Sequence, residues 1–210
     1  MLSLNELGLQ FCNLCELSGK NYGKPDQPPT WRRPSQKVDG EGPLPCDVLF
    51  LGEGPGENED REGVPFVGDS GKFLRSVIVA AGLSKLRIRI SNVVRCRPPG
   101  NRAPTPLEIR ACTKWLDLEL GLADPKVIVC LGKSAMSYFF TDFKFKGKVG
   151  DYVGRELPLG GELAIGAYHP AARMVSQRNA ILPVLRKVAA EKFGILPPPE
   201  RPTDYQLLVP

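Results

Sequence analysis

The sequence predicts an α/β fold, a three-layer α/β/α sandwich around a central, mostly parallel four-stranded sheet. Short apolar runs that end at glycine, such as CDVLFLGEG and KVIVCLG, are typical of buried strands. Segments with helical spacing of apolar residues separate these runs along the chain. Strands that alternate with helices favour a parallel sheet with helices on both faces.

The composition indicates one domain. The chain has 210 residues, 42% of them hydrophobic, which is enough to build one core. We expect residues 1–196 to form this domain and the Pro-rich residues 197–210 to be a poorly packed tail. No apolar run approaches the roughly 20 residues that cross a bilayer, and no secretory signal pattern opens the chain. These features favour a cytoplasmic protein without a membrane partner.

The first part of the chain combines a helical pattern with a long loop. Leu4, Leu7 and Phe11 have helical spacing, which predicts a helix over residues 3–11. Residues 16–45 are rich in Gly, Pro and charge, so we expect a loop of the length that is usually functional. The run CDVLFLGEG follows it as the first strand.

The middle of the chain predicts a helix, a strand and a second helix in that order. DSGKFLRSVIVAAGL has helical apolar spacing, and IRISNVVRC reads as the second strand. The segment APTPLEIRACTKWLDLELGL has strong start signals for a helix. Thr105 is the expected N-cap, Pro106 the first helical residue and Glu108 the partner in a capping box.

The last part of the chain supplies two more strands. KVIVCLG is the third, and the helical segment KSAMSYFF follows it directly. ELAIGAYHP is the fourth, and it ends at the only histidine, His169. NAILPVLRKVAAEKFG predicts a final helix that bends or begins near Pro183.

Four of the six cysteines could hold a metal. Cys12 and Cys15 form a close pair, whereas Cys96 and Cys112 lie 16 positions apart. Four thiolates can bind zinc or an iron–sulfur cluster, and the spacing alone leaves both possibilities open, together with four unligated thiols. Cys130 lies in an apolar run and is expected to be a small buried hydrophobe.

The richest segment for ligand binding follows the first strand. Its glycines allow backbone N–H groups to approach a ligand closely, although GEGPG does not match the G-x-G-x-x-G nucleotide fingerprint. We expect no helix directly after these glycines. The acidic residues that come next favour a solvated loop over a metal site; they are Glu57, Glu59, Asp60 and Glu62.

Three predicted strands deliver polar side chains to one edge of the sheet. Glu53 follows the first strand, Asn92 ends the second and His169 ends the fourth. Ligands of open α/β sheets bind at the carboxyl ends of the strands. The convergence of these three side chains therefore predicts a functional site there.

The motifs together resemble those of the family 4 uracil-DNA glycosylases, the iron–sulfur members of that superfamily. The similar segments are GEGPGENEDREGVPFVGDSGKFL, ISNVVRCRPPGNRAPTPLEIRAC, VIVCLGKSA and YHPAARM, and the resemblance spans about residues 9–192. It implies a monofunctional DNA repair glycosylase that flips uracil out of DNA and hydrolyses its N-glycosidic bond. It also implies a [4Fe-4S] cluster whose ligands are Cys12, Cys15, Cys96 and Cys112.

The resemblance assigns roles to the residues of the strand edge. The implied uracil-binding residues are Glu53, Gly54, Glu59, Phe66, Asn92 and His169, with Glu53, Asn92 and His169 as the catalytic ones. Phe66 matches the residue that stacks on the base, Asn92 the reader of its polar edge and His169 the residue that faces O2. Glu59 matches an acidic pocket position whose role stays open. Gly54 stands where family 1 enzymes have an aspartate, so water activation cannot depend on that carboxylate.

The DNA-binding residues implied by the resemblance are Arg173 and Met174. Arg173 stands four residues after His169, where the superfamily inserts an apolar wedge into the duplex. Arg173 could itself enter the duplex, it could contact the backbone while Met174 is the wedge, or it could be a solvated loop residue. The net charge of +5 and the pI of 8.9 suit a nucleic-acid-binding protein, although ordinary surface charge is an alternative explanation. The resemblance implies that the partner is uracil-containing DNA, and we expect a monomer.

Two other classes of protein remain as alternatives. The first is a non-catalytic nucleic-acid-binding protein of the same fold with a structural metal. The second is a nucleotide-using redox enzyme in which Cys12 and Cys15 transfer electrons, although no fingerprint for a nicotinamide or flavin cofactor is present.

Overall fold

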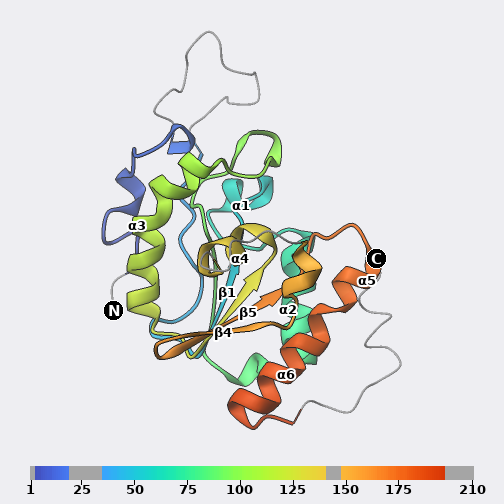
Figure 1. Ribbon diagram of the computed structural model, residues 1–210. Coiled ribbons are helices and arrows are strands. Elements are labelled where there is room, and N and C mark those ends of the chain that lie inside the picture. Colours follow the sequence, from blue (N-terminus) through green and yellow to red (C-terminus); the bar gives the residue numbers. More distant parts are fainter. Residues whose placement is uncertain (1–2, 19–34, 141–147, 197–210) are drawn as a thin grey trace.

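The computed structural model describes residues 3–18, 35–140 and 148–196, and it has the predicted α/β architecture (Figure 1). Its sheet has the strand order β2-β1-β3-β5-β4, in which only β4 is antiparallel to its neighbour. The strands are β1 Val48–Gly52, β2 Ile88–Asn92, β3 Val127–Leu131, β4 Glu156–Leu159 and β5 Glu162–Ala167. The sheet therefore has five strands, and the prediction of four was wrong in number.

Helices cover both faces of the sheet. The α-helices are α1 Glu57–Glu62, α2 Asp69–Ala80, α3 Pro106–Ala123, α4 Lys133–Phe139, α5 Val175–Asn179 and α6 Ile181–Phe193. The 3-10 helices are η1 Leu9–Phe11, η2 Glu16–Ser18, η3 Leu83–Lys85, η4 Pro99–Asn101 and η5 Val149–Tyr152. Side chains from α2 and α6 share one buried cluster, and side chains from α3 and α4 share another.

The strands divide their side chains between these two clusters. In β1, Val48 and Phe50 pack toward α2 and α6, whereas Leu49 and Leu51 pack toward α3 and α4. This alternation is the period of two that an extended strand imposes. Because both faces are covered, all five residues of β1 are buried, which confirms the three-layer sandwich.

Three predictions for individual segments were wrong. The helix over residues 3–11 is replaced by a turn and η1, because Gly8 has a φ of 100° and interrupts it; Phe11 is then 80% exposed. A helix, α1, does begin directly after Gly56. Its residues Glu59 and Asp60 are buried, so the acidic segment is not a solvated loop.

Other predicted features agree with the structure. Thr105 Oγ1 accepts a hydrogen bond from the Glu108 backbone N–H, and the Glu108 carboxylate accepts one from Thr105 N–H, which completes the capping box of α3. Cys130 is fully buried in β3. The predictions for residues 19–34 and for the tail 197–210 fall outside the described residues. Within the described part of the chain, no helix is long and apolar enough to cross a membrane.

Candidate active site

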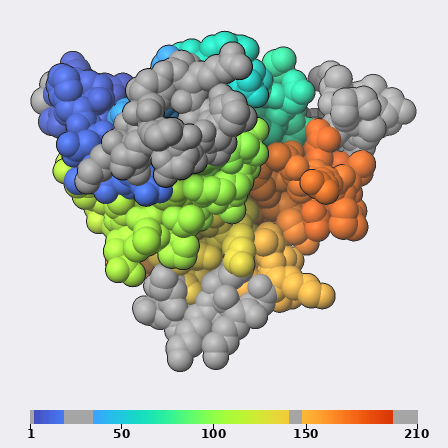
Figure 2. Space-filling model, turned by 90° about the horizontal axis from the view of Figure 1, so that it is seen from above, coloured from blue at the N-terminus to red at the C-terminus, as the bar shows by residue number. Residues whose placement is uncertain are grey.

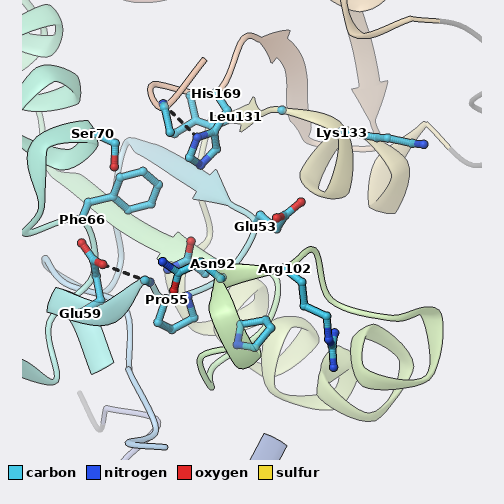
Figure 3. Close-up of a pocket in the computed structure, with 16 residues that line it drawn as sticks. Glu53, Pro55, Glu59, Phe66, Ser70, Asn92, Arg102, Leu131, Lys133 and His169 are labelled. Atoms are coloured by element: carbon cyan, nitrogen blue, oxygen red, sulfur yellow. Dashed lines mark hydrogen bonds between the residues drawn. The ribbon is translucent and has the colours of Figure 1, made fainter. Parts of the chain in front are cut away.

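The four parallel strands end at a cavity of about 400 Å³. Its lining comes from the ends of β1, β2, β3 and β5 and from the loops that follow them (Figure 3). All six positions predicted to bind a base line it: Glu53, Gly54, Glu59, Phe66, Asn92 and His169. Residues up to 116 positions apart in sequence thus meet because parallel strands present their carboxyl ends at one edge.

Gly52, the last residue of β1, lets two of these side chains approach each other. A Cβ atom on Gly52 would lie 2.5 Å from Cζ of Phe66 and 2.6 Å from Oδ1 of Asn92. Any larger residue would therefore displace the Phe66 ring or the Asn92 amide. Gly52 therefore both ends β1 and leaves the space that the side chains of Phe66 and Asn92 occupy.

Asn92 lines the cavity and has an unsatisfied amide oxygen. The side chain is 3% exposed, and its Oδ1 has no hydrogen-bond partner among the described residues. A buried polar atom without a partner costs about 1–3 kcal/mol. A ligand that offers an N–H group to Oδ1 would recover this cost.

His169 follows β5 and is held in one tautomer. Its Nδ1 accepts a hydrogen bond from the Ala171 backbone N–H at 3.1 Å (Figure 3). Burial lowers the pKa of His169 below its ordinary value of 6.5, although the nearby Glu53 opposes this shift. The imidazole is therefore neutral near pH 7 and has its proton on Nε2, where it can serve as a donor.

Phe66 faces His169 across the cavity. Their ring centroids are 6.0 Å apart, and the ring planes differ by 33°. Figure 3 shows Phe66 and Glu53 on opposite sides of the space that His169 and Asn92 also border. A flat ring lying on Phe66 would have polar side chains around its edge.

Glu53 is fixed by a residue that the sequence did not single out. Its Oε2 accepts a hydrogen bond from Ser134 Oγ at 2.6 Å. Ser134 lies in the first turn of α4, directly beyond the end of β3. The rule that located the other residues, which is to search the residues after each strand, would have found Ser134 and Lys133 if applied to β3.

Glu59 differs from the other pocket residues because its carboxylate is already occupied. Oε1 accepts hydrogen bonds from the backbone N–H groups of Val67 and Gly68, and Oε2 accepts one from Gly56 N–H. Among the described residues, no group of three or more His, Cys, Asp or Glu side chains is arranged to hold a metal ion. Glu59 is accordingly a structural part of the cavity wall.

Comparison with known proteins identifies the family. The sequence profile of the Uracil DNA glycosylase superfamily matches residues 40–191, which include every strand and all of the cavity residues. The chain belongs to the uracil-DNA glycosylase superfamily.

The chain is similar to curated Type-4 and Type-5 members of this superfamily. The chain is 39% identical to the Type-4 uracil-DNA glycosylase of Sulfurisphaera tokodaii over 174 residues, covering 78% of this chain and 74% of that one. It is 41% identical to the Type-4 enzyme of Thermotoga maritima over 155 residues, covering 73% and 78%. A Type-5 uracil-DNA glycosylase of Thermus thermophilus is 37% identical over 168 residues, covering 72% and 73%.

In this member of the superfamily, the four cysteines predicted to bind a cofactor line one small cavity. They are Cys12, Cys15, Cys96 and Cys112, and all are free thiols. Figure 2 shows the described N-terminal segment, in blue, lying against the green segment that contains α3. Two sulfur atoms accept hydrogen bonds: Cys12 Sγ from Trp115 Nε1–H at 3.2 Å and Cys112 Sγ from Arg95 N–H at 3.3 Å.

The donor set of this cavity fits a thiolate-bound group. Burial raises the pKa of the Cys112 thiol to about 11 and raises the pKa values of Cys15 and Cys96 as well. Buried thiols of this kind become thiolates only beside a strong positive charge, which a metal centre supplies. Four thiols line one cavity, and the sulfur atoms of two of them already accept hydrogen bonds from N–H groups. This set of donor atoms fits a metal centre that is bound through thiolates.

The predicted DNA-binding residues lie outside the base-sized cavity. Arg173 and Met174 are exposed on the loop between β5 and α5, and Met174 is 59% exposed. They are four and five residues beyond His169 on the same loop, so they lie beside the cavity in sequence without lining it. This placement leaves their three alternative roles open.

Proposed function

We propose that the chain is a DNA repair enzyme that flips uracil out of DNA and hydrolyses its N-glycosidic bond, leaving an abasic site. The observation that supports this most is the unsatisfied Oδ1 of Asn92, buried in a cavity that also contains Phe66 and the donor Nε2–H of His169. Uracil has an N–H group flanked by two carbonyls on its edge, which is the pattern that an amide and a second donor complement.

Recognition begins when the base leaves the duplex. Unstacking and unpairing cost a few kcal/mol, which the cavity must offset. Stacking on Phe66 contributes roughly 1–3 kcal/mol and hardly distinguishes one base from another. Asn92 then accepts from N3–H and donates to O4, so the choice of uracil depends on this amide and on the shape of the cavity.

Cleavage of the glycosidic bond makes the base negative and the sugar positive. His169 can stabilise the negative charge, and Glu53 can stabilise the positive charge. The electron pair of the C1′–N1 bond goes to the base, whose negative charge collects at O2 and O4. His169 donates from Nε2 to O2 without having to be charged itself. The sugar becomes positive, and Glu53, fixed by Ser134, places its carboxyl group on the side of the cavity opposite Phe66. Water then adds to C1′ and loses one proton, and the uracil anion takes up a proton, so the products are an abasic sugar and neutral uracil.

The cofactor proposed for the thiol cavity is a [4Fe-4S] cluster with Cys12, Cys15, Cys96 and Cys112 as ligands. The four thiols share one cavity, and four Cys thiolates are the usual ligands of such a cluster. When bound, such a cluster joins the N-terminal segment to the segments around β2 and α3 and stabilises the fold.

The partner that follows from this function is uracil-containing DNA. The net charge of +5 favours binding to phosphates by release of counterions. Arg173 and Met174, exposed beside the cavity, are the proposed contacts to the strand from which the base is removed.

The test is to incubate the purified holoprotein with oligonucleotides that contain one uracil, one thymine or one cytosine, and then to treat them with alkali. We expect strand breaks only at uracil, because hydrolysis leaves an alkali-labile abasic site. Binding of the oligonucleotide without any strand break would instead favour the non-catalytic nucleic-acid-binding protein. Binding of a pyridine or flavin nucleotide would favour the redox enzyme.

A further inference from the structure

Glu59 connects two segments that both form the cavity wall. Glu59 is 8% exposed, and its carboxylate accepts three backbone hydrogen bonds. One of them, from Gly56 N–H at 3.0 Å, comes from the turn after β1. The other two, from Val67 N–H and Gly68 N–H at 2.9 Å each, come from the segment directly after Phe66. A carboxylate offers about four acceptor positions, so most of its capacity is used within the protein.

The segment that Glu59 holds has a conformation that needs support. Phe66 has a φ of 55°, a left-handed conformation that is unusual for a bulky residue. Such conformations persist where the surrounding structure fixes them. Gly71 is packed against the same residue, since a Cβ there would lie 1.8 Å from the Phe66 carbonyl oxygen.

The ring of Phe66 depends on this backbone for its orientation. It lies against Gly52 on one side and faces His169 at 6.0 Å on the other. A change in the backbone at Phe66 and Val67 would move the ring out of the plane in which it faces the cavity. The hydrogen bonds from Val67 and Gly68 to Glu59 join this backbone to α1.

We propose that Glu59 is a positioning residue for Phe66: it fixes the ring on which the flipped base stacks and does not itself bind the base or a water molecule. This inference rests on the proposed function for the identity of the base. Because three N–H groups already surround the carboxylate, its negative charge is directed at the protein backbone and away from the ligand.

The first experiment measures backbone protection without using activity. Amide hydrogen exchange of the holoprotein is compared for wild type, Glu59→Ala and Glu59→Gln, with Glu62→Ala as a control on the exposed side of the same helix. We expect exchange at Val67 and Gly68 to become about tenfold faster or more in Glu59→Ala, with the core of α2 and β3 unchanged. Glu59→Gln retains one oxygen acceptor and should give a smaller increase. Unchanged exchange at Val67 and Gly68, or a uniform increase throughout the protein, would overturn the proposal.

The second experiment is a double-mutant cycle in single-turnover uracil release. Glu59→Ala should slow release roughly 10- to 100-fold in the wild-type background, similar to Phe66→Ala, because stacking on the ring is what is lost. In the Phe66→Ala background the same substitution should change the rate by less than about threefold. Equal losses in both backgrounds would show that Glu59 acts on the base independently, and would overturn the proposal. If wild type releases no uracil, the proposed function fails, while the exchange experiment still tests the position of the segment.

Discussion

A single backbone hydrogen bond determines which nitrogen of His169 can act on a ligand. The N–H of Ala171 occupies Nδ1, so the neutral ring has its proton on Nε2. A neutral donor is sufficient for the proposed role, since the charge that it stabilises develops only as the base leaves. Protonation of Nδ1 would remove the acceptor of the hydrogen bond from Ala171 N–H.

This arrangement predicts the pH dependence of uracil release. The folded-state pKa of His169 is lowered from 6.5 by burial, so the neutral form persists as the pH falls through 6.5 and is lost only below it. The single-turnover rate should be constant near neutral pH, with an acid limb centred below pH 6.5. His169→Ala should lower the rate about 10²- to 10³-fold and remove this limb. An acid limb centred above pH 6.5, or a fully active His169→Ala variant, would contradict the assignment.

At the scale of elements, β2 is joined to α3 by a buried network of charges. Glu119 of α3 accepts hydrogen bonds from Arg89 Nε at 2.6 Å and from Ser91 Oγ at 2.7 Å. It also accepts one at 2.5 Å from Arg95, whose backbone N–H donates to Cys112. The network therefore connects β2, which ends at Asn92, with α3, which contains Cys112, and with Arg95, the residue before Cys96.

Removing the carboxylate from this network should destabilise the protein strongly. Glu119→Ala leaves the buried guanidinium of Arg95 without its carboxylate partner and leaves Arg89 with only Asp39, which costs about 3–5 kcal/mol in free energy of unfolding. Burial alone would raise the pKa of Glu119, but Arg95 and Arg89 lower it below 4.5. Its contribution is thus present above pH 4.5 and is lost as the pH falls below that value. Urea unfolding of wild type and Glu119→Ala measures the free energy of unfolding of both proteins at pH 7 and at pH 4. The difference between the two proteins should be smaller at pH 4, and an equal difference at both pH values would contradict the account.

The loop between β5 and α5 supplies the prediction for Arg173. If Arg173 enters the duplex, Arg173→Ala should slow uracil release from double-stranded DNA at least about tenfold more than from single-stranded DNA, where no stack needs to be held open. Single-turnover rates on both substrates test this, with Lys85→Ala, at an exposed position of η3, as a control for charge alone. An equal loss on both substrates would indicate a phosphate contact, and no loss would indicate a solvated residue.

Two elements escaped sequence-based prediction for identifiable reasons. β4 is short, contains Pro158 and pairs only with β5 at the edge of the sheet, so it lacks the continuous apolar run of a central strand. α1 was mistaken for a loop because its four acidic residues suggested solvation. The hydrogen bonds to the carboxylates of Glu59 and Asp60 come from residues 35, 36, 56, 67 and 68, all of which lie outside the helix itself.

At the scale of the whole molecule, the sequence predicts the site through the topology of the sheet. Glu53, Asn92 and His169 follow apolar strands that are easily recognised, and parallel pairing brings those strand ends together. The close approaches at Gly52 and the tautomer of His169 could not be predicted, because they depend on atoms from several loops. The resemblance to a known family was needed to assign Phe66, which is also a buried residue of the core.

The proposed cluster is a property of the whole molecule, since its ligands come from three segments. The holoprotein purified without oxygen should contain about four iron and four sulfide per chain, as expected for a [4Fe-4S] cluster. Cys112→Ser should lower both contents and the melting temperature, whereas Cys130→Ser, in the apolar core, should lower stability without lowering the ratio of iron to folded protein. Stoichiometric zinc without iron in the native protein would contradict the proposal.

The central claim is that the buried amide of Asn92 selects uracil at the edge of the sheet. Single-turnover release from single-stranded oligonucleotides containing uracil or cytosine tests it most directly, for wild type, Asn92→Asp and the exposed control Asn58→Asp. Wild type and Asn58→Asp should release uracil and leave cytosine. Asn92→Asp replaces the donor to O4 with a carboxylate, so uracil release should fall roughly 10- to 100-fold and the preference for uracil over cytosine should weaken. An Asn92→Asp variant with the rate and base preference of wild type would contradict the account.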